Sequence, residues 1–310
     1  MSGMLDEFSV RLIVYASMIS TLCVGFTLTY IIERFPNFAH ADYASIGSAV
    51  AYTLVRFYGF NPYASWPLAA LAGGLIGCGL YILVVKPLRR TGGDGIRLAF
   101  AMFALSRILA TLIALYSFWV LSRFRIHSRG FLLRGWDFHL NGYPGVLFTA
   151  PATAILLVIL LHLFLTRTRL GIAMRAVTED PTLASCMGVN VSRIHLLSWF
   201  LTGSMAALAG AVLSLAMSVR IGGAEELLIT VFAGSVLGGL ENIYGAVVGG
   251  FAVAFIQKIL PSIVLRLLGS LGIWMAGFEA LTPIIVLVVI LMVEPGGLTA
   301  LAKRITRTSI

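Results

Sequence analysis

The chain has 310 residues, of which 59% are hydrophobic and 11% are charged, and its mean hydropathy is +0.97. Soluble domains contain about 25% charged and 45–50% apolar residues, so this composition excludes a water-soluble enzyme. The net charge of +9 does not indicate nucleic-acid binding, because the arginines lie in loops between long apolar runs and form no single basic face. The sequence therefore predicts an integral membrane protein.

Six apolar runs reach the length of about 20 residues that a helix needs to cross a bilayer. They cover 12–32, 57–85, 98–122, 140–166, 194–219 and 267–293. Three shorter apolar pieces lie at 43–55, 227–240 and 242–257. The pattern predicts an all-α integral membrane protein, a polytopic helical bundle of about eight or nine membrane segments, some of them short or re-entrant.

Basic residues predict the orientation of the chain, since loops on the cytoplasmic side carry an excess of Lys and Arg. The segments 86–97 and 166–193 and the tail from residue 303 together hold eleven basic residues, against four in the segment 123–144. We therefore expect the first three segments on the cytoplasmic face. The side of the N-terminus stays open, because 43–55 either crosses the membrane or dips in and returns.

Glycine is concentrated in the stretch 234–250, GSVLGGLENIYGAVVGG. Short, glycine-rich membrane segments indicate a substrate path, because broken backbone is tolerated in a membrane only where it is buried or lines a cavity. Gly238, Gly239, Glu241 and Asn242 are therefore candidate pathway residues, and Glu241 and Asn242 are expected to form a turn. Close packing of helices through small residues explains the same pattern, and the two interpretations are compatible.

The loop 166–194 contains the signals of a short helix. Asp180 is a good N-cap, Pro181 suits the first helical position and Gly188 is a natural C′ residue. The resulting helix, 181–187, has about two turns and is too short to be stable alone in water. Such a helix on the cytoplasmic face indicates docking into the groove of a partner protein. A helix lying flat on the membrane surface is the alternative.

A spaced sequence motif extends over most of this loop. Its residues are Thr168, Gly171, Arg175, Ala176, Ala184, Gly188, Val189, Asn190 and Arg193. This order resembles T-x-x-G-x-x-x-R-A…A-x-x-x-G-I-N-x-x-R, the coupling region of permease subunits of branched-chain amino acid ABC transporters, the LivH/LivM family. The stretches 37–40 (NFAH), 86–89 (KPLR), 238–250 and 294–298 (EPGGL) resemble further landmarks of the LivH-like subunit, in the same order. Ala41, Glu241 and Glu294 depart from the family pattern.

The resemblance implies a single transmembrane permease domain over 1–310, with 166–194 as its cytoplasmic coupling loop. It would form the translocation pathway for branched-chain or related amino acids in an importer of the plasma (inner) membrane. The implied partners are a second, related permease subunit, two cytoplasmic ABC ATPase subunits and an extracytoplasmic solute-binding protein. The residues expected to couple to the ATPase are Arg175, Glu179, Asp180, Pro181, Ala184, Gly188 and Asn190.

The chain itself is not expected to be an enzyme or to bind a cofactor. A nucleotide-binding P-loop requires G-x-x-x-x-G-K-[ST], and none of the lysines, Lys86, Lys258 and Lys303, follows a glycine. ATP would therefore be used by the partner subunits. Cys23 and Cys78 lie inside apolar runs, where buried structural thiols are expected, and the sequence contains no metal-ligand spacing.

Several polar residues inside or beside the apolar runs are further candidates for the pathway. Arg107 lies about 15 Å into its run by helical rise, where an arginine is costly and points to a function. In this position Arg107 either binds the carboxylate of a substrate or forms an ion pair with a carboxylate of the protein, such as that of Glu279. Asn37, His40 and Asp42 precede a short segment, and they either line an entrance or serve as a helix cap.

Residues near the ends of the spans are expected at the membrane interface. His195 lies near such an end, and Trp199 fits an aromatic belt. Two other classes of transporter compete with the importer subunit. An ion-coupled secondary transporter would need intramembrane carboxylates, for which Glu279 and Glu241 are available. A passive channel for a small solute such as urea or an amide fits the glycine-rich segments, and dependence on an ATPase separates the importer from both.

Overall fold

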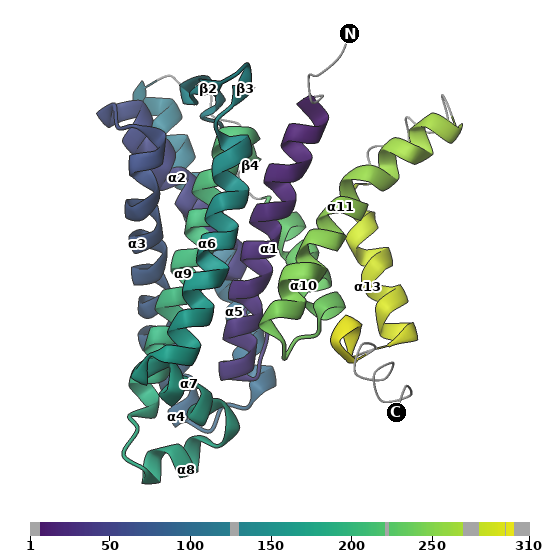
Figure 1. The fold of residues 1–310 in the computed structure, drawn as a ribbon. Helices are drawn as coiled ribbons and strands as arrows, with labels where there is room; N and C mark the ends of the chain where they lie inside the picture. Colours follow the sequence, from purple (N-terminus) through teal and green to yellow (C-terminus); the bar gives the residue numbers. More distant parts are fainter. Residues whose placement is uncertain (1–6, 125–129, 221–222, 269–278, 295, 301–310) are drawn as a thin grey trace.

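The computed structural model describes residues 7–124, 130–220, 223–268, 279–294 and 296–300 (Figure 1). Nearly all of these residues are helical. The helices are α1 (Glu7–Glu33), α2 (His40–Tyr58), α3 (Pro62–Leu80) with its π-helical continuation (Tyr81–Val85), α4 (Lys86–Arg90), α5 (Gly95–Phe124), α6 (Val146–Arg167), α7 (Arg169–Glu179), α8 (Pro181–Cys186), α9 (Val191–Ala216), α10 (Ala224–Gly238), α11 (Ile243–Leu268) and α13 (Leu281–Val293). Seven helical segments in the described part of the chain are long and apolar enough to span a membrane, which confirms the all-helical polytopic fold.

The β structure is confined to short pairs at one end of the bundle. β1 (Gly130–Phe131) pairs antiparallel with β4 (Val219–Arg220), and β2 (His139–Leu140) forms a hairpin with β3 (Tyr143–Pro144). The opposite end carries α4, α7 and α8 (Figure 1). The basic segments 86–97 and 166–193 therefore lie at the same end, as expected, and we name it the basic end. The third basic segment, 303–307, lies outside the described residues.

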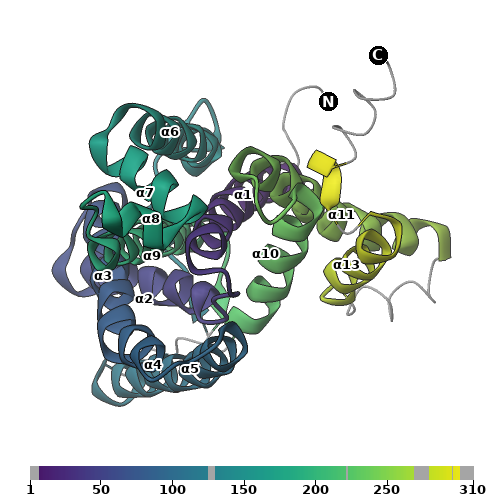
Figure 2. The same ribbon diagram turned by 90° about the horizontal axis from the view of Figure 1, so that it is seen from below.

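The helix α1 runs from the end of the β pairs to the basic end, through the middle of the molecule (Figures 1 and 2). In its most apolar stretch 94% of the residues are buried. Several of its hydroxyl groups bond to its own backbone, Ser17 to Ile13 O at 2.8 Å and Thr21 to Ser17 O at 3.1 Å. Thr29 bonds in the same way to Gly25 O. These polar side chains are thus satisfied inside the helix that carries them.

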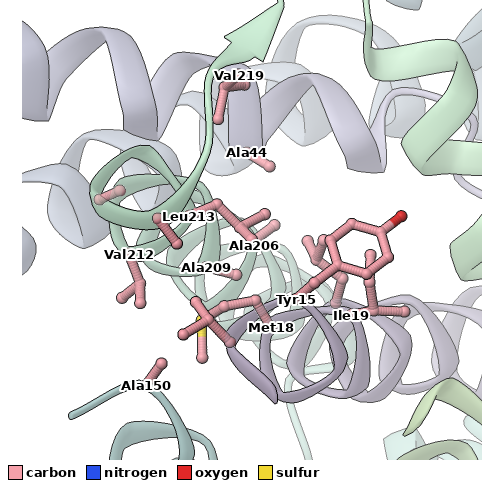
Figure 3. Close-up of a cluster of buried hydrophobic side chains, with 14 of the residues drawn as sticks. Tyr15, Met18, Ile19, Ala44, Ala150, Ala206, Ala209, Val212, Leu213 and Val219 are labelled. Carbon is pink, nitrogen blue, oxygen red and sulfur yellow. The ribbon is translucent and has the colours of Figure 1, made fainter. Parts of the chain in front are cut away.

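The core forms where α1, α2, α6 and α9 meet (Figure 3). Small residues allow α2 and α9 to approach backbone to backbone. A Cβ at Gly47 would lie 1.8 Å from the carbonyl oxygen of Ala207, and a Cβ at Gly210 would lie 1.8 Å from that of Ala44. No side chain fits at either position, so these two glycines set the distance between the helices.

Two helices begin part of the way across the bundle. His40, the first residue of α2, bonds through Nε2 to the carbonyl of Leu22 at 3.0 Å. Leu22 precedes the end of α1 by 11 residues, or about 16 Å of helical rise. The 15 residues of α10 extend over about 22 Å, less than the roughly 30 Å of the hydrocarbon core. The expected short segment 227–240 is therefore confirmed as α10, whereas α2, with 19 residues, is longer than the expected piece 43–55 and begins inside the bundle.

Three of the expected span boundaries are wrong. The run 57–85 is broken, because Gly59 adopts a left-handed conformation after α2 and Asn61 caps α3. The run 140–166 begins with the β2–β3 hairpin, so the helix starts only at Val146. The piece 242–257 is not short, because α11 continues to Leu268, and the apolar run from 267 is divided between α11 and α13. Residues 269–278 of that run lie outside the described part.

Candidate functional site

The α7–α8 unit (169–186) forms a platform across the basic end. Thr168 caps α7 by accepting a hydrogen bond from the backbone N–H of Gly171 at 3.0 Å. A Cβ at Gly171 would lie 2.1 Å from the carbonyl oxygen of Phe164, so glycine is required where α7 turns sharply away from α6. Met174 and Val177 are buried on the inner side of α7. The T-x-x-G part of the motif thus fixes the platform to the end of α6.

The short helix predicted in the loop is present as α8. Asp180 accepts hydrogen bonds from the backbone N–H groups of Thr182 and Leu183, at 2.8 and 3.0 Å, and Pro181 is the first helical residue. Gly188 has φ +84°. The N–H of Val189 bonds to Ala184 O and that of Gly188 to Ser185 O, the two bonds of a Schellman motif. Both ends of α8 are therefore fixed by local hydrogen bonds.

The outer face of the platform is apolar in its centre. Ala184 is 5% exposed and holds α8 against the bundle, whereas Leu183 is 62% and Met187 79% exposed. Arg175 and Glu179 are exposed on α7. Asn190 caps α9 by accepting from the N–H of Arg193 at 3.1 Å. Among the predicted coupling residues, Arg175 and Glu179 are thus exposed on the platform. The others hold its helices in place: Asp180, Pro181, Ala184, Gly188 and Asn190.

A buried polar network lies directly above this platform. The carboxylate of Glu33, at the end of α1, accepts hydrogen bonds from His195 Nδ1 at 2.7 Å and Trp199 Nε1 at 2.8 Å. It also forms an ion pair with Arg89 at 2.6 Å, and its side chain has no exposed surface. Tyr81, in the π-helical segment, stacks on the His195 ring. The network ties α1, α4 and α9 together next to α7 and α8.

The expectation that His195 and Trp199 lie at the membrane interface is wrong. His195 is 4% exposed and Trp199 is fully buried, because both donate to the Glu33 carboxylate. Glu33 itself was not identified from the sequence. It is the first charged residue after a long apolar run, and this pattern indicates the end of a membrane span. It does not indicate a hydrogen-bond partner such as His195, which follows 162 residues later in the chain.

A second charged group lies about half-way along the bundle, where the side chains of Arg107 and Glu225 are 40% and 59% exposed. Arg107 is about 18 Å along α5 by helical rise, and its guanidinium pairs with Glu225, in the first turn of α10. It also bonds to Ser106 Oγ at 3.2 Å. The buried carboxylate of Asp42, in the first turn of α2, faces Ser106 and Arg107. We name Asp42, Ser106, Arg107 and Glu225 the midplane cluster.

The midplane cluster corrects the expected partner of Arg107. Glu279 does not reach Arg107 but pairs with Lys258. Glu225 was not singled out in the sequence, although two consecutive acidic residues before a short apolar piece are an available signal. The first turns of α2 and α10 both point at this cluster. Helices that start inside a membrane with their positive ends toward one point are typical of substrate sites in transporters.

The other predicted entrance residues lie beside α1. Asn37 is buried and accepts from the backbone N–H of Ala39 at 3.1 Å, which forms a turn before α2 and not a cap of the helix. His40 is fully buried against Leu22 and the ring of Phe26. Asn37 and His40 thus shape the entry of the chain into α2.

The glycine-rich stretch makes the tight connection between α10 and α11 near the basic end. A Cβ at Gly238 would lie 2.1 Å from the carbonyl oxygen of Gly245, and Gly239 has φ +97°. Asn242 begins α11 by accepting from the N–H groups of Tyr244 and Gly245. Glu241 pairs with Arg34 at 2.7 Å. The expected turn and close helix packing are confirmed, whereas a part in the pathway stays a prediction.

The site contains no sign of a metal centre. No group of three His, Cys, Asp or Glu side chains in the described segments could hold an ion. The geometry instead defines a polytopic bundle with a fixed platform at its basic end and a charged cluster in its middle. These are the parts of a membrane transport subunit.

Comparison with known proteins identifies the family. Residues 8–293 match the model of the branched-chain amino acid transport system permease component, and the chain belongs to this family. It is 34% identical over 96% of its length, and 94% of the relative's, to the probable branched-chain amino acid transport permease protein LivH of Methanocaldococcus jannaschii. It is 29% identical to the high-affinity permease protein BraD of Pseudomonas aeruginosa, over 76% of this chain and 79% of the relative, and 26% identical to LivH of Escherichia coli, over 78% and 82%. No solved structure gives a significant match. The chain is thus a permease subunit of an amino acid ABC importer.

Proposed function

We propose that this permease subunit imports branched-chain or related aliphatic amino acids across the plasma (inner) membrane, with its basic end in the cytoplasm. A second, related permease subunit would complete the pathway. An extracytoplasmic binding protein would deliver the solute, and two cytoplasmic ATPase subunits would hydrolyse the ATP. The names of the relatives, at up to 34% identity, support this class of solute.

The α7–α8 unit is the observation that carries the proposal. Its helix α8 is short, fixed at both ends and apolar on its outer face, where Leu183 and Met187 are exposed beside the charged residues Arg175 and Glu179. Exposed apolar side chains rimmed by polar residues mark a protein-binding surface. The inner side of this unit packs against the bundle, since Met174, Val177 and Ala184 share a buried cluster with Ile32 of α1 and Ile194 of α9.

The midplane cluster is the proposed constriction of the pathway. The Arg107–Glu225 pair joins α5 to α10 at about the depth where α2 begins. Ion pairs inside a membrane are costly unless they face protein or water, which supports a position on a polar route. In the proposal this route opens when the pair separates during the ATPase cycle.

Co-purification tests the docking of an ATPase on α8. The tagged permease would be extracted gently from native membranes, and the proteins that accompany it identified by mass spectrometry. We expect an ATPase subunit with the wild type. The double variant Leu183→Ser, Met187→Ser removes two apolar side chains worth about 1.5–3 kcal/mol each on burial, so recovery of the ATPase is expected to fall at least about tenfold.

A matched variant separates docking from general damage. Leu132→Ser changes another exposed apolar side chain, 45% exposed and at the other end of the bundle, and it is expected to retain the ATPase. Transport by the purified permease alone, in liposomes without ATP, would overturn the proposal. An ion-coupled transporter or a passive channel would then take its place.

A further inference from the structure

The outer half of the bundle contains a pocket of about 370 Å³ between α1, α10 and α11. A second cavity of about 360 Å³ adjoins it, and both are lined by Met217, Lys258 and Glu279. The upper parts of α1 and α11 diverge at this place (Figure 1). Pockets of about 300–1,000 Å³ hold small molecules, so the first cavity has the size for a single amino acid.

The pocket presents a positive charge in a fixed position. The Lys258 ammonium lies 4.5 Å from the centre of the Tyr15 ring and pairs with Glu279. An ammonium has three N–H donors, so Lys258 can bind a further carboxylate beside Glu279. Tyr15 is 4% exposed and therefore forms a rigid wall behind the ammonium.

A negative charge lines the same pocket. Glu226 lies in the first turn of α10, where the helix dipole stabilises a carboxylate. Glu226 is exposed, so its carboxylate is accessible to a cationic group of a ligand in the pocket.

A neutral hydrogen-bonding group lies between the two charges. Gln257 is 5% exposed, and its Oε1 accepts from Tyr15 at 3.0 Å and from Thr230 at 3.1 Å. These two bonds fix the carboxamide, so its NH₂ group remains as a donor for a ligand in the pocket that Gln257 lines. Leu213 and Leu227 supply an apolar wall.

We propose that this pocket is an outer binding site for a zwitterionic aliphatic amino acid. Lys258 and Gln257 bind the ligand's carboxylate, Glu226 binds its ammonium group, and the side chain packs on Leu213 and Leu227. The proposal rests on the proposed function, because it gives the imported solute a site in the permease itself. Glu226 adjoins Glu225 of the midplane cluster in the first turn of α10.

Equilibrium binding to the purified permease in nanodiscs, without the binding protein, tests the site. The probes are radiolabelled leucine, leucinamide, which lacks the carboxylate, and 4-methylpentanoate, which lacks the ammonium. The wild type is expected to bind leucine at least about tenfold more tightly than either analogue, because a site built to bind a polar group rejects a ligand without it. Each charge variant is expected to lose one preference and keep the other.

The variants are Lys258→Gln and Glu226→Gln. Lys258→Gln is expected to bind leucine and leucinamide alike, whereas Glu226→Gln binds leucine and 4-methylpentanoate alike. Lys258→Arg keeps the charge and is expected to keep the preference for a carboxylate, which separates lost recognition from lost folding. Arg97→Gln and Asp94→Asn, exposed charges at the basic end, serve as matched controls with unchanged binding.

The complete transporter, with its ATPases and binding protein, is measured in parallel for leucine uptake. Uptake without saturable binding to the isolated permease overturns the outer site and leaves the proposed function standing. Unchanged preferences in both charge variants overturn it as well, as does an equal loss of all three ligands in Lys258→Gln and Lys258→Arg. A complete transporter that moves no amino acid overturns the proposed function itself.

Discussion

Gly188 is the residue on which the geometry of α8 depends most directly. Its φ of +84° lies in the left-handed region, where a β-branched side chain is strained. We expect Gly188→Val to distort the end of α8 at a local cost of about 1–3 kcal/mol, and to reduce ATP-driven uptake severalfold while the protein still inserts. Uptake by the reconstituted transporter and the amount of permease in the membrane are measured together.

Asparagine supplies the control for this prediction. Asn tolerates the left-handed conformation far better than Val, and no other atoms lie within 4 Å of a Cβ at Gly188. Gly188→Asn is therefore expected to retain most of the uptake. Equal uptake by the Val variant and the wild type would contradict a coupling role for this end of α8.

The buried carboxylate of Glu33 interacts with three side chains, those of Arg89, His195 and Trp199. Glu33→Gln would leave the Arg89 guanidinium without its ion-pair partner, and removing one partner of a buried pair costs about 3–5 kcal/mol. We expect the melting temperature of the solubilised permease to fall by several degrees. Glu241→Gln is the comparison, because the Arg34–Glu241 pair is 56% and 75% exposed and such pairs contribute only about 0–1 kcal/mol. Similar melting temperatures for the two variants would show that the Glu33 network does not stabilise the fold.

The residues that were predicted correctly are those whose roles are local. Asp180, Pro181 and Gly188 act on backbone within five residues of themselves, so their types and spacing suffice. Glu33 and Arg107 act on side chains 162 and 118 residues away. One sequence contains no information on which carboxylate meets which base, and Arg107 was accordingly given the wrong possible partner.

At the scale of helices, the short segments were predicted better than the boundaries. The helix α11 passes through Gln257 and Lys258, where the apolar run ends in the sequence. It continues because Gln257 bonds to Tyr15 and Thr230, and because Lys258 pairs with Glu279. Tertiary partners therefore allowed polar residues in a helix that hydropathy alone ends too early.

The helices α5 and α10 are joined by the Arg107–Glu225 pair, and a charge reversal tests its importance. Arg107→Glu places a carboxylate beside Glu225 and the buried Asp42, so that an attraction across the α5–α10 contact is replaced by a repulsion. Uptake by the reconstituted transporter is expected to fall at least about tenfold. The double variant Arg107→Glu, Glu225→Arg restores opposite charges and is expected to recover a substantial part of it.

A surface pair of the same kind provides the reference. Arg97→Glu with and without Asp94→Arg changes an exposed pair at the start of α5, and neither variant is expected to alter uptake. If the double reversal at the midplane recovers nothing beyond the single variant, direct pairing of the two charges is not what the pathway requires.

At the scale of the whole molecule, native cysteines report the orientation. Cys186 is exposed on α8 at the basic end, whereas Cys23 is buried in α1. A membrane-impermeant maleimide is expected to label Cys186 in inside-out vesicles and not in right-side-out vesicles. The double variant Cys186→Ser, Trp136→Cys, which places the thiol at a position 48% exposed at the other end, is expected to show the reverse. Labelling of Cys186 from outside would invert the proposed orientation.

The central position of α1 has a consequence for the way the protein is made. Its neighbour α9 ends at Ala216, 183 residues after the end of α1. At about 5–20 residues per second, a ribosome needs about 10 to 40 s to produce that length. Until then α1 lacks α9, against which it packs in the finished bundle.

Three hydroxyl groups of α1 are already hydrogen-bonded during the time before α9 is synthesised. Ser17, Thr21 and Thr29 already donate to carbonyls one turn back in their own helix, so they require no partner from a helix not yet synthesised. These three hydroxyls of α1 thus depend on no other helix. The later helices α6, α9, α10 and α11 then pack against a segment in which these hydroxyls are already bonded.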